Sequence, residues 1–263
     1  MAKIARFARG RDIRYGLVLD ENTLRIIQGD IFSTWWPTEQ TVRLQDVRLL
    51  PPVDPPNIIA IGLNYRAHAQ ESGAALPSVP AIFIKATTAL CAPGAPIVLP
   101  RVAPNHVDYE CELAIVIGRR AKHVRPEEAH AYVLGYTCAN DVSARDCQRS
   151  DAQWARAKSF DTFAPLGPWI QTDLDPDNAP IRTRLNGQIM QDSNTNDLIF
   201  KTSELISFVS DAMTLLPGTV ILTGTPSGVG FARKPPVFLR PGDVIEIEID
   251  GIGTLRNPVM AEE

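Results

Sequence analysis

Short apolar runs of strand length recur along most of this 263-residue chain. Near its start, residues 14–20 and 23–29 flank a polar Asp-Glu-Asn turn, a pattern typical of a β-hairpin. Further along, residues 57–65, 80–86 and 111–118 form apolar runs bounded by turn residues. These runs predict strands of a buried sheet.

Helical spacing of apolar residues is confined to fewer segments. Residues 143–160 lack internal glycine and proline and predict one helix, and residues 203–216 predict another. Asn186-Gly187 lies between two strand-like runs and is a strong hairpin signal. Because strands outnumber helices and several connections are hairpins, we predict an α+β fold with a curved mixed sheet.

A proline-rich connector, LLPPVDPPN, divides the chain near residue 50. Its two Pro-Pro pairs exclude a helix or a central strand and predict a stiff link. We therefore expect a small N-terminal β module over residues 1–50 and a main domain over residues 57–263.

Composition narrows the class of protein. Hydrophobic residues make up 44% and charged residues 21% of the chain, which is ordinary for a globular protein. The net charge of −4 argues against a nucleic-acid partner or an acidic membrane surface, and no apolar run approaches the ~20 residues of a membrane span. The start of the chain does not resemble a secretory signal, and the four cysteines have no paired spacing. We expect reduced thiols and a cytoplasmic location.

The segment DYECELAIVIG contains two acids at the start of an otherwise apolar strand. Because strand side chains alternate, Glu110 and Glu112 share one face, with Cα atoms about 7 Å apart. Two uncompensated charges at that distance repel by about 2 kcal/mol at an effective dielectric constant of about 20. Either the strand end is exposed and the glutamates are solvated, or a cation lies beside them.

A third carboxylate occurs in CANDVSARDCQ. Asp141 is predicted at the start of a helix, with Arg145 and Gln148 on the same helical face. Asp141 has an ordinary interpretation as a helix N-cap with an ion pair to Arg145. Alternatively, Asp141 joins Glu110 and Glu112 in an oxygen-rich site for Mg²⁺ or Mn²⁺, and Arg145 binds a substrate carboxylate. The residues alone leave both interpretations open.

Six segments in one order resemble the fumarylacetoacetate hydrolase family, from about residue 57 to near the C-terminus. They are GLNYRAHAQE, DYECELAIVIG, GYTCANDVSARDCQ, AKSFDTFAPLGPWI, LNGQIMQDSNT and ILTGTPSGVG. The resemblance implies a mixed β-sheet rolled into a barrel-like core with flanking helices, usually in a homodimer. Many bacterial members carry a small N-terminal β module before that core.

The same resemblance implies roles for individual residues. Glu110, Glu112 and Asp141 match positions that hold a divalent metal, Mg²⁺ with Mn²⁺ as the alternative. Arg145 and Gln148 match positions that bind the 2-oxo-acid end of the substrate.

Further positions of the family surround the same pocket. His68 and Glu71 match a pair that activates water, and Lys158 matches a catalytic position at the 2-oxo-acid end of the substrate. Gly224 and Thr225 match positions that line the pocket. The chain departs from the family at residues 85–86, where Lys-Ala replaces a frequent Lys-Pro.

Together these features predict an enzyme of metal-stabilised enolates. The first interpretation is a Mg²⁺-dependent hydrolase that cleaves a C–C bond in acylpyruvate-type 2,4-dioxo acids. The alternatives are an isomerase or decarboxylase of unsaturated dicarboxylates from aromatic breakdown, or a 2-oxo-acid decarboxylase. A non-catalytic binding protein is the alternative of another class, and the His68–Glu71 pair favours an enzyme over it.

Overall fold

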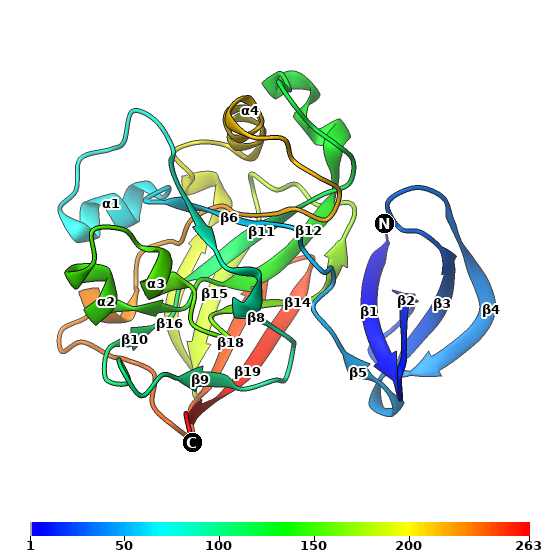
Figure 1. Cartoon of the computed structure of the whole chain (residues 1–263), viewed down its shortest axis with the longest axis horizontal. Helices are drawn as coiled ribbons and strands as arrows, with labels where there is room; N and C mark the ends of the chain where they lie inside the picture. The colour runs from blue at the N-terminus through cyan, green and yellow to red at the C-terminus, as the bar shows by residue number, and fades with distance from the viewer. Residues whose placement is uncertain (1) are drawn as a thin grey trace.

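The structure is a computed structural model and describes residues 2–263. One large mixed sheet runs through the whole molecule (Figure 1). In spatial order its strands are β4 (Trp35–Arg43), β3 (Thr23–Gly29), β2 (Asp12–Val18), β1 (Lys3–Arg9), β14 (Ala164–Gln171), β12 (Val133–Asn140), β11 (Cys111–Ile117), β17 (Val220–Leu222), β6 (Ile58–Gly62) and β7 (Ala81–Lys85). Two short strands join it at the side, β5 (Arg48–Leu49) on β1 and β8 (Leu90–Cys91) on β14. Most pairs are antiparallel, whereas β17 and β6 are parallel.

A second sheet packs on the first and encloses the core. Its strands are β16 (Gln188–Asn194), β15 (Pro180–Leu185), β18 (Val244–Ile249), β19 (Gly253–Ala261) and β9 (Ile97–Leu99). Contacts of β11 with β15 and of β12 with β18 and β19 join the two layers. Along β18 the isoleucines are buried and alternate with more exposed glutamates, as expected for a strand with one face on the core.

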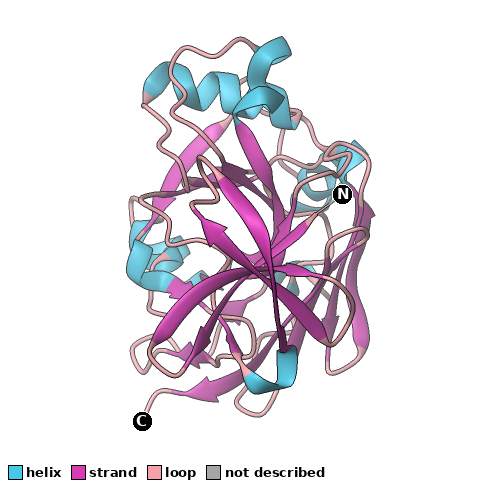
Figure 2. Cartoon of the chain, turned by 90° about the vertical axis from the view of Figure 1, so that its right-hand side faces the viewer, coloured by secondary structure: helices cyan, strands magenta, loops and turns pink. Residues whose placement is uncertain are grey.

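The expected α+β class and mixed sheet are confirmed, but the described residues form no closed barrel. The large sheet ends at two edges, β4 and β7. Closing a sheet requires continuous pairing around a ring. Here the last strands of the chain pair with one another in the second sheet instead, so the core lies between two layers (Figure 2).

The N-terminal strands stand beside the main body in Figure 1 and continue its large sheet. Lys3 of β1 pairs with Gln171 of β14, so the two regions share hydrogen bonds. The N-terminal strands also have a small apolar cluster of their own, with Phe7 and Leu24 at its centre. Between these strands and the main body lies the short turn η1 (Leu44–Asp46).

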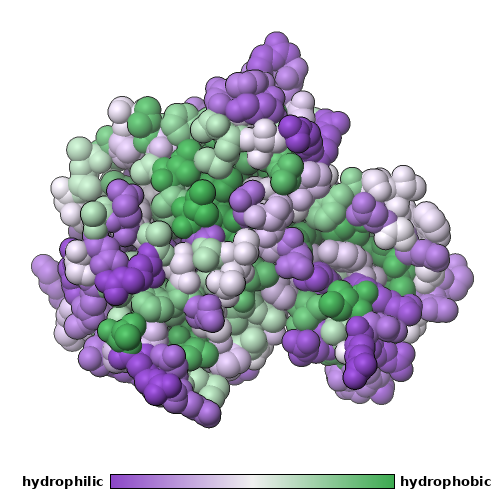
Figure 3. All heavy atoms as spheres, in the orientation of Figure 1, coloured by the Kyte–Doolittle hydropathy of each residue, from purple (hydrophilic) through white to green (hydrophobic). Residues whose placement is uncertain are grey.

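The helices are few and short. They are α1 (Arg66–Ser72), α2 (Arg145–Ser150), α3 (Ala155–Lys158) and α4 (Thr202–Ala212), with 3₁₀ turns at η2 (Thr87–Ala89), η3 (Pro126–Tyr132), η4 (Thr195–Asp197) and η5 (Gly230–Ala232). No helix among the described residues is long and apolar enough to cross a membrane. On the face shown in Figure 3, polar residues form the projecting tip at the top and much of the left and lower edge of the main body, whereas apolar residues gather in its upper middle.

The single helix predicted over residues 143–160 is wrong. The segment begins with β13 (Ser143–Ala144), which pairs with β10 (Val107–Asp108), and the helical part is divided into α2 and α3. At the break, the Asp151 carboxylate accepts hydrogen bonds from the Ser150 hydroxyl at 2.9 Å and from Arg156 Nε at 2.7 Å. Local side-chain bonds of this kind compete with continued helix.

Candidate active site

Every aspartate, glutamate, lysine and arginine that is buried among the described residues belongs to one cluster. Its members are Lys85, Asp108, Glu110, Glu112, Asp141, Arg145 and Lys158. Four carboxylates therefore face three cations. Burying an ion costs several kcal/mol unless it is well paired. A buried cluster with an excess of negative charge is better explained by function than by stability.

The strand pairing brings three of the acids together. Glu112 lies in β11 with Glu110 just before it, and Asp141 directly follows the neighbouring strand β12. The Asp141 N–H donates to the Glu110 carbonyl at 2.9 Å, and the Glu110 N–H donates to Asn140 Oδ1 at 3.0 Å. One carboxylate oxygen from each acid lies within 4.8 Å of the others. We call Glu110, Glu112 and Asp141 the acid triad.

Two members of the triad are neutralised by lysines. Lys158 Nζ lies 2.9 Å from Glu110 Oε2 and 2.6 Å from Asp141 Oδ2, and Lys85 Nζ lies 2.5 Å from Asp141 Oδ1. Burial alone raises the pKa of Glu110, but the charges of Lys158 and Arg145 outweigh it and lower the pKa to about 2. No role was predicted for Lys85 from the sequence, where only the replacement of a frequent proline by Ala86 was noted. The signal that could have identified Lys85 as a site residue is a lysine at the end of an apolar strand-like run.

The third member, Glu112, forms no ion pair with any of the described residues. Glu112 is 1% exposed and, among the described residues, accepts one hydrogen bond, from the Gly224 N–H at 2.6 Å. Burial and the charges of Asp141 and Glu110 raise the pKa of Glu112 well above its usual value. Three converging carboxylate oxygens, one of them without a paired cation, are the donor set that Mg²⁺ or Mn²⁺ prefers, so the residues present fit such an ion.

Arg145 does not follow the ordinary interpretation, in which Asp141 caps the helix and pairs with it. It begins α2, with Ala144 at the N-cap position, so Asp141 is not the cap and does not pair with Arg145. Instead, Arg145 Nε donates to Asp108 at 2.9 Å, and Nη2 forms an ion pair with Glu110 at 2.7 Å. The reason is that β13 comes before the helix and turns Arg145 toward β10. Gln148 Oε1 accepts from Arg145 Nη1 at 2.8 Å.

Beside this cluster is a pocket of about 150 Å³. Polar and charged side chains line one part of it: His68, Glu110, Glu112, Asp141, Arg145, Gln148, Lys158 and Thr225. Apolar residues, including Ile61, Phe83, Trp154 and Phe231, line the rest. Of the ten residues predicted for the site, eight line the pocket, and Glu71 and Gly224 each contact one of those eight.

His68 and Glu71 lie one turn apart on α1. Their side chains are joined by a hydrogen bond of 3.1 Å between His68 Nδ1 and Glu71 Oε2, which leaves His68 Nε2 free for other partners. Glu71 Oε1 also accepts from the Gly228 N–H at 2.9 Å. Burial raises the pKa of Glu71, but the bonds from His68 and Gly228 outweigh it and lower the pKa.

Gly224 and Thr225 follow β17 at the end of the pocket. Gly224 has φ +98°, and a Cβ there would lie 2.7 Å from Asn64 Cβ, so this position requires glycine. Thr225 Oγ1 accepts from Gln191 Nε2 at 2.8 Å, and Gln191 Oε1 accepts from the Cys111 N–H at 3.0 Å. Sequence reasoning missed Gln191, because nothing in its own segment distinguishes it from a surface glutamine.

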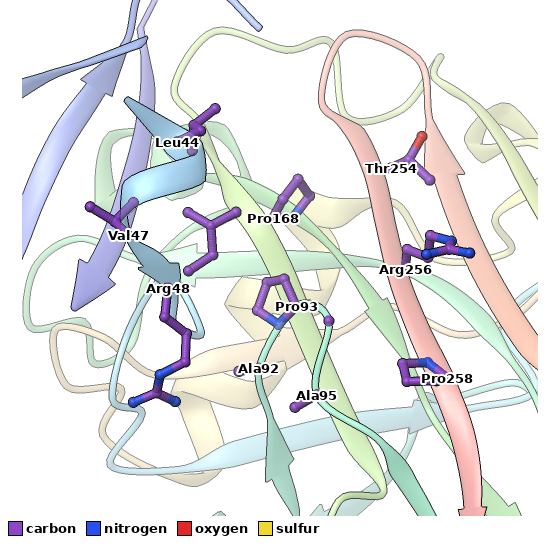
Figure 4. Close-up of a pocket in the computed structure, with 12 residues that line it drawn as sticks. Leu44, Val47, Arg48, Ala92, Pro93, Ala95, Pro168, Thr254, Arg256 and Pro258 are labelled. Atoms are coloured by element: carbon purple, nitrogen blue, oxygen red, sulfur yellow. The ribbon is translucent and has the colours of Figure 1, made fainter. Parts of the chain in front are cut away.

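A larger cavity of about 640 Å³ lies elsewhere, between the N-terminal strands and the main body (Figure 4). Its lining comes from η1, β5, β14, β19 and the loop at residues 92–95. Among the described residues it has no carboxylate and two arginines, Arg48 and Arg256. The smaller, charged pocket is therefore the candidate active site.

Comparisons with known proteins cover the whole described chain. Residues 57–260 match the fumarylacetoacetate (FAA) hydrolase C-terminal family, and residues 2–52 match the Rv2993c-like N-terminal family. A crystal structure of 2-hydroxyhepta-2,4-diene-1,7-dioate isomerase from Mycobacterium marinum is 42% identical, with a TM-score of 0.90 over 100% of this chain and 99% of that one.

Two further similarities come from other organisms. The mitochondrial oxaloacetate tautomerase Fahd2a of Rattus norvegicus is 47% identical over 222 residues, which are 83% of this chain and 71% of that protein. The fumarylacetoacetate hydrolase of Exiguobacterium antarcticum is 37% identical, with a TM-score of 0.90 and full coverage of both chains.

Proposed function

Since this chain belongs to the fumarylacetoacetate hydrolase family, we propose that it is a divalent-metal-dependent tautomerase or isomerase of small 2-oxo acids. The observation that carries the proposal is the excess negative charge of the acid triad beside Lys158 and Arg145. Hydrolysis is the first interpretation of the sequence. The relatives named as an isomerase and an oxaloacetate tautomerase favour enol–keto interconversion instead.

The acid triad would hold the metal ion. When bound, Mg²⁺ or Mn²⁺ supplies a Lewis acid that stabilises negative charge on the oxygen of an enolate. The neighbouring cations serve the rest of the substrate. Arg145 and Gln148 bind its carboxylate, and Lys158 Nζ holds a proton beside the enolate oxygen.

His68 moves the proton at carbon. Its Nδ1 is engaged by Glu71, so Nε2 is the nitrogen that takes a proton from the carbon next to the carbonyl. As Lys158 Nζ gives a proton to the oxygen, the keto form becomes the enol, and the reverse transfers restore it. The apolar wall of Phe83, Trp154 and Phe231 excludes water from the enolate.

The test follows the enol form of oxaloacetate by its ultraviolet absorbance while it converts to the keto form. We expect acceleration by the Mg²⁺-loaded protein over the same Mg²⁺ concentration alone, and loss of that acceleration in His68→Ala. A protein that releases CO₂ or cleaves acylpyruvates, but leaves the enol–keto rate unchanged, would overturn the proposal.

A second candidate is hydrolysis of a C–C bond in acylpyruvates. The His68–Glu71 pair favours it, because a histidine oriented by a carboxylate is suited to activating water. The Gly228 N–H fixes Glu71 further. Product analysis separates the two functions, since hydrolysis of an acylpyruvate yields pyruvate and a second acid, whereas tautomerisation conserves the carbon skeleton.

A further inference from the structure

Asp108 is a fully buried carboxylate that the proposed mechanism does not use. It is 0% exposed and does not line the pocket. Its oxygens accept from the Tyr109 N–H at 2.9 Å, the Gly230 N–H at 2.8 Å, the Phe231 N–H at 3.0 Å and Arg145 Nε at 2.9 Å. A buried carboxylate this well bonded is fixed in place.

Two of these donors belong to the loop at residues 228–231, which approaches Asp108 closely. A Cβ on Gly230 would lie 2.5 Å from Asp108 Oδ1 and would collide with the Val237 carbonyl. Only glycine therefore allows the backbone N–H groups of this loop to reach the carboxylate.

The same loop contacts both the His68–Glu71 pair and Arg145 in the candidate active site. The Gly228 N–H donates to Glu71, and the Phe231 ring meets the His68 ring edge-on with centroids 6.5 Å apart. On its other side, the Phe231 ring centroid lies 4.5 Å from Arg145 Cζ in a cation–π contact. The loop thus lies between the His68–Glu71 pair and Arg145.

We propose that Asp108 is a positioning residue that holds Arg145 and the loop 228–231 in one fixed relation. Its carboxylate bonds the guanidinium and two N–H groups of the loop, and so aligns the group that binds the substrate carboxylate with the pair that moves the proton. The inference deepens the proposed function and rests on it for the role of Arg145. Because Asp108 has no access to the pocket, it acts only through these neighbours.

The test is a double-mutant cycle of Asp108→Asn and Arg145→Gln. Asparagine has nearly the same shape as aspartate, but its side-chain N–H₂ group cannot accept the hydrogen bonds that the Asp108 carboxylate receives from Arg145 and the backbone N–H groups. We expect kcat/KM for oxaloacetate tautomerisation to fall about 10- to 100-fold in D108N, as for other residues that orient site groups. In the R145Q background the same change should cost less than about 2-fold, because the relation between Arg145 and the loop that Asp108 fixes is already lost there. If the fold-loss of kcat/KM in the double variant equals the product of the losses in the two single variants, the proposal is overturned.

A second measurement needs neither substrate nor metal. The Arg145 Nε–H resonance, assigned by its absence in R145Q, should exchange with solvent about 10-fold or more faster in D108N than in the unchanged protein. Equal exchange overturns the role of Asp108. A chain without tautomerase activity overturns the proposed function, while this measurement still decides the role of Asp108.

Two further variants serve as a matched control and as a replacement for D108N. Asp177→Asn makes the same chemical change at a carboxylate that accepts from the Thr202 N–H at 3.1 Å, away from the pocket, and should leave kcat/KM within about 2-fold. If D108N does not fold, Phe231→Leu removes the ring contact and leaves Asp108 intact. It should lower kcat/KM about 5-fold, and this loss should be smaller in R145Q. The part that stays reflects the contact of Phe231 with His68 and its place in the pocket wall. An unchanged rate in F231L overturns the proposal in that case.

Discussion

The candidate active site and the larger cavity beside the N-terminal strands differ in size and in charge, and it is the smaller of the two that is lined by buried charges. The larger, about 640 Å³, lies between the N-terminal strands and the main body, and its lining includes no buried ion (Figure 4). The smaller, about 150 Å³, borders the cluster that contains every buried charged side chain of the described residues other than histidine. Packing two regions together leaves space at little cost, whereas burying ions is expensive. Function is therefore better located by the energetic cost of a site than by its volume.

The largest expected effect is that of removing the metal. With EDTA, the tautomerase rate at the smaller pocket should fall about 10³-fold, because a Lewis acid contributes several kcal/mol to stabilising an enolate. Excess Mg²⁺ should restore it. The assay compares initial rates before chelation, after it and after restoration, with protein-free controls at each metal concentration. A rate indifferent to the chelator contradicts the assignment.

Within the smaller pocket, two glutamates should respond in opposite directions. Glu110→Gln removes one of the two carboxylates that pair with Lys158 and one of the two that pair with Arg145, and should lower the free energy of unfolding by about 3 kcal/mol. Glu112→Gln removes a repelling charge, and its amide oxygen can still accept from the Gly224 N–H, so stability should hold or rise. Urea denaturation in EDTA measures both. Equal losses of the free energy of unfolding in the two variants would show that the charge of Glu112 is balanced by a cation.

A smaller effect is expected from the pH dependence of stability, through Glu71 at the edge of the pocket. The folded-state pKa of Glu71 is lowered below the ordinary value of 4.5. Its bonds therefore contribute stability that is fully present above pH 4.5 and is lost as the pH falls through the lowered folded-state pKa. The difference in stability between the unchanged protein and Glu71→Gln should narrow over that acid range. Thermal denaturation from pH 6 downward measures it, and a constant difference contradicts the role of the carboxylate charge.

The smallest effect is expected at the larger cavity. Arg48→Ala and Thr254→Val change its lining without touching the charged cluster. Each should leave kcat/KM within about 2-fold, as is usual for surface substitutions. A tenfold loss in either variant would show that the larger cavity is part of the active site.

Local patterns predicted the parts of the fold that depend on neighbours in sequence. Asn186-Gly187 turns β15 into β16 with positive φ at both residues, and β11 is buried along its whole length. The acid triad could also be predicted, because Glu110 and Glu112 are two residues apart, Asp141 offers a third carboxylate, and the family resemblance implies that the three converge.

Features that depend on distant contacts were not predicted. Lys85 reaches Asp141 across 56 residues, and Asp108 reaches Gly230 across 122. Nothing near Lys85 or Asp108 in the sequence indicates these partners. The break between α2 and α3 was not predicted for a different reason. The segment contains no glycine or proline and so resembles one continuous helix, but the side-chain hydrogen bonds of Asp151 interrupt it.

The central claim is that the unpaired charge of Glu112 completes a metal site. Calorimetric titration of Mg²⁺ into the metal-free protein and into Glu112→Gln tests it most directly. We predict one Mg²⁺ per chain in the unchanged protein and binding weakened at least about 100-fold in the variant, which loses one of three charged ligands. Equal binding by the two proteins would contradict the claim.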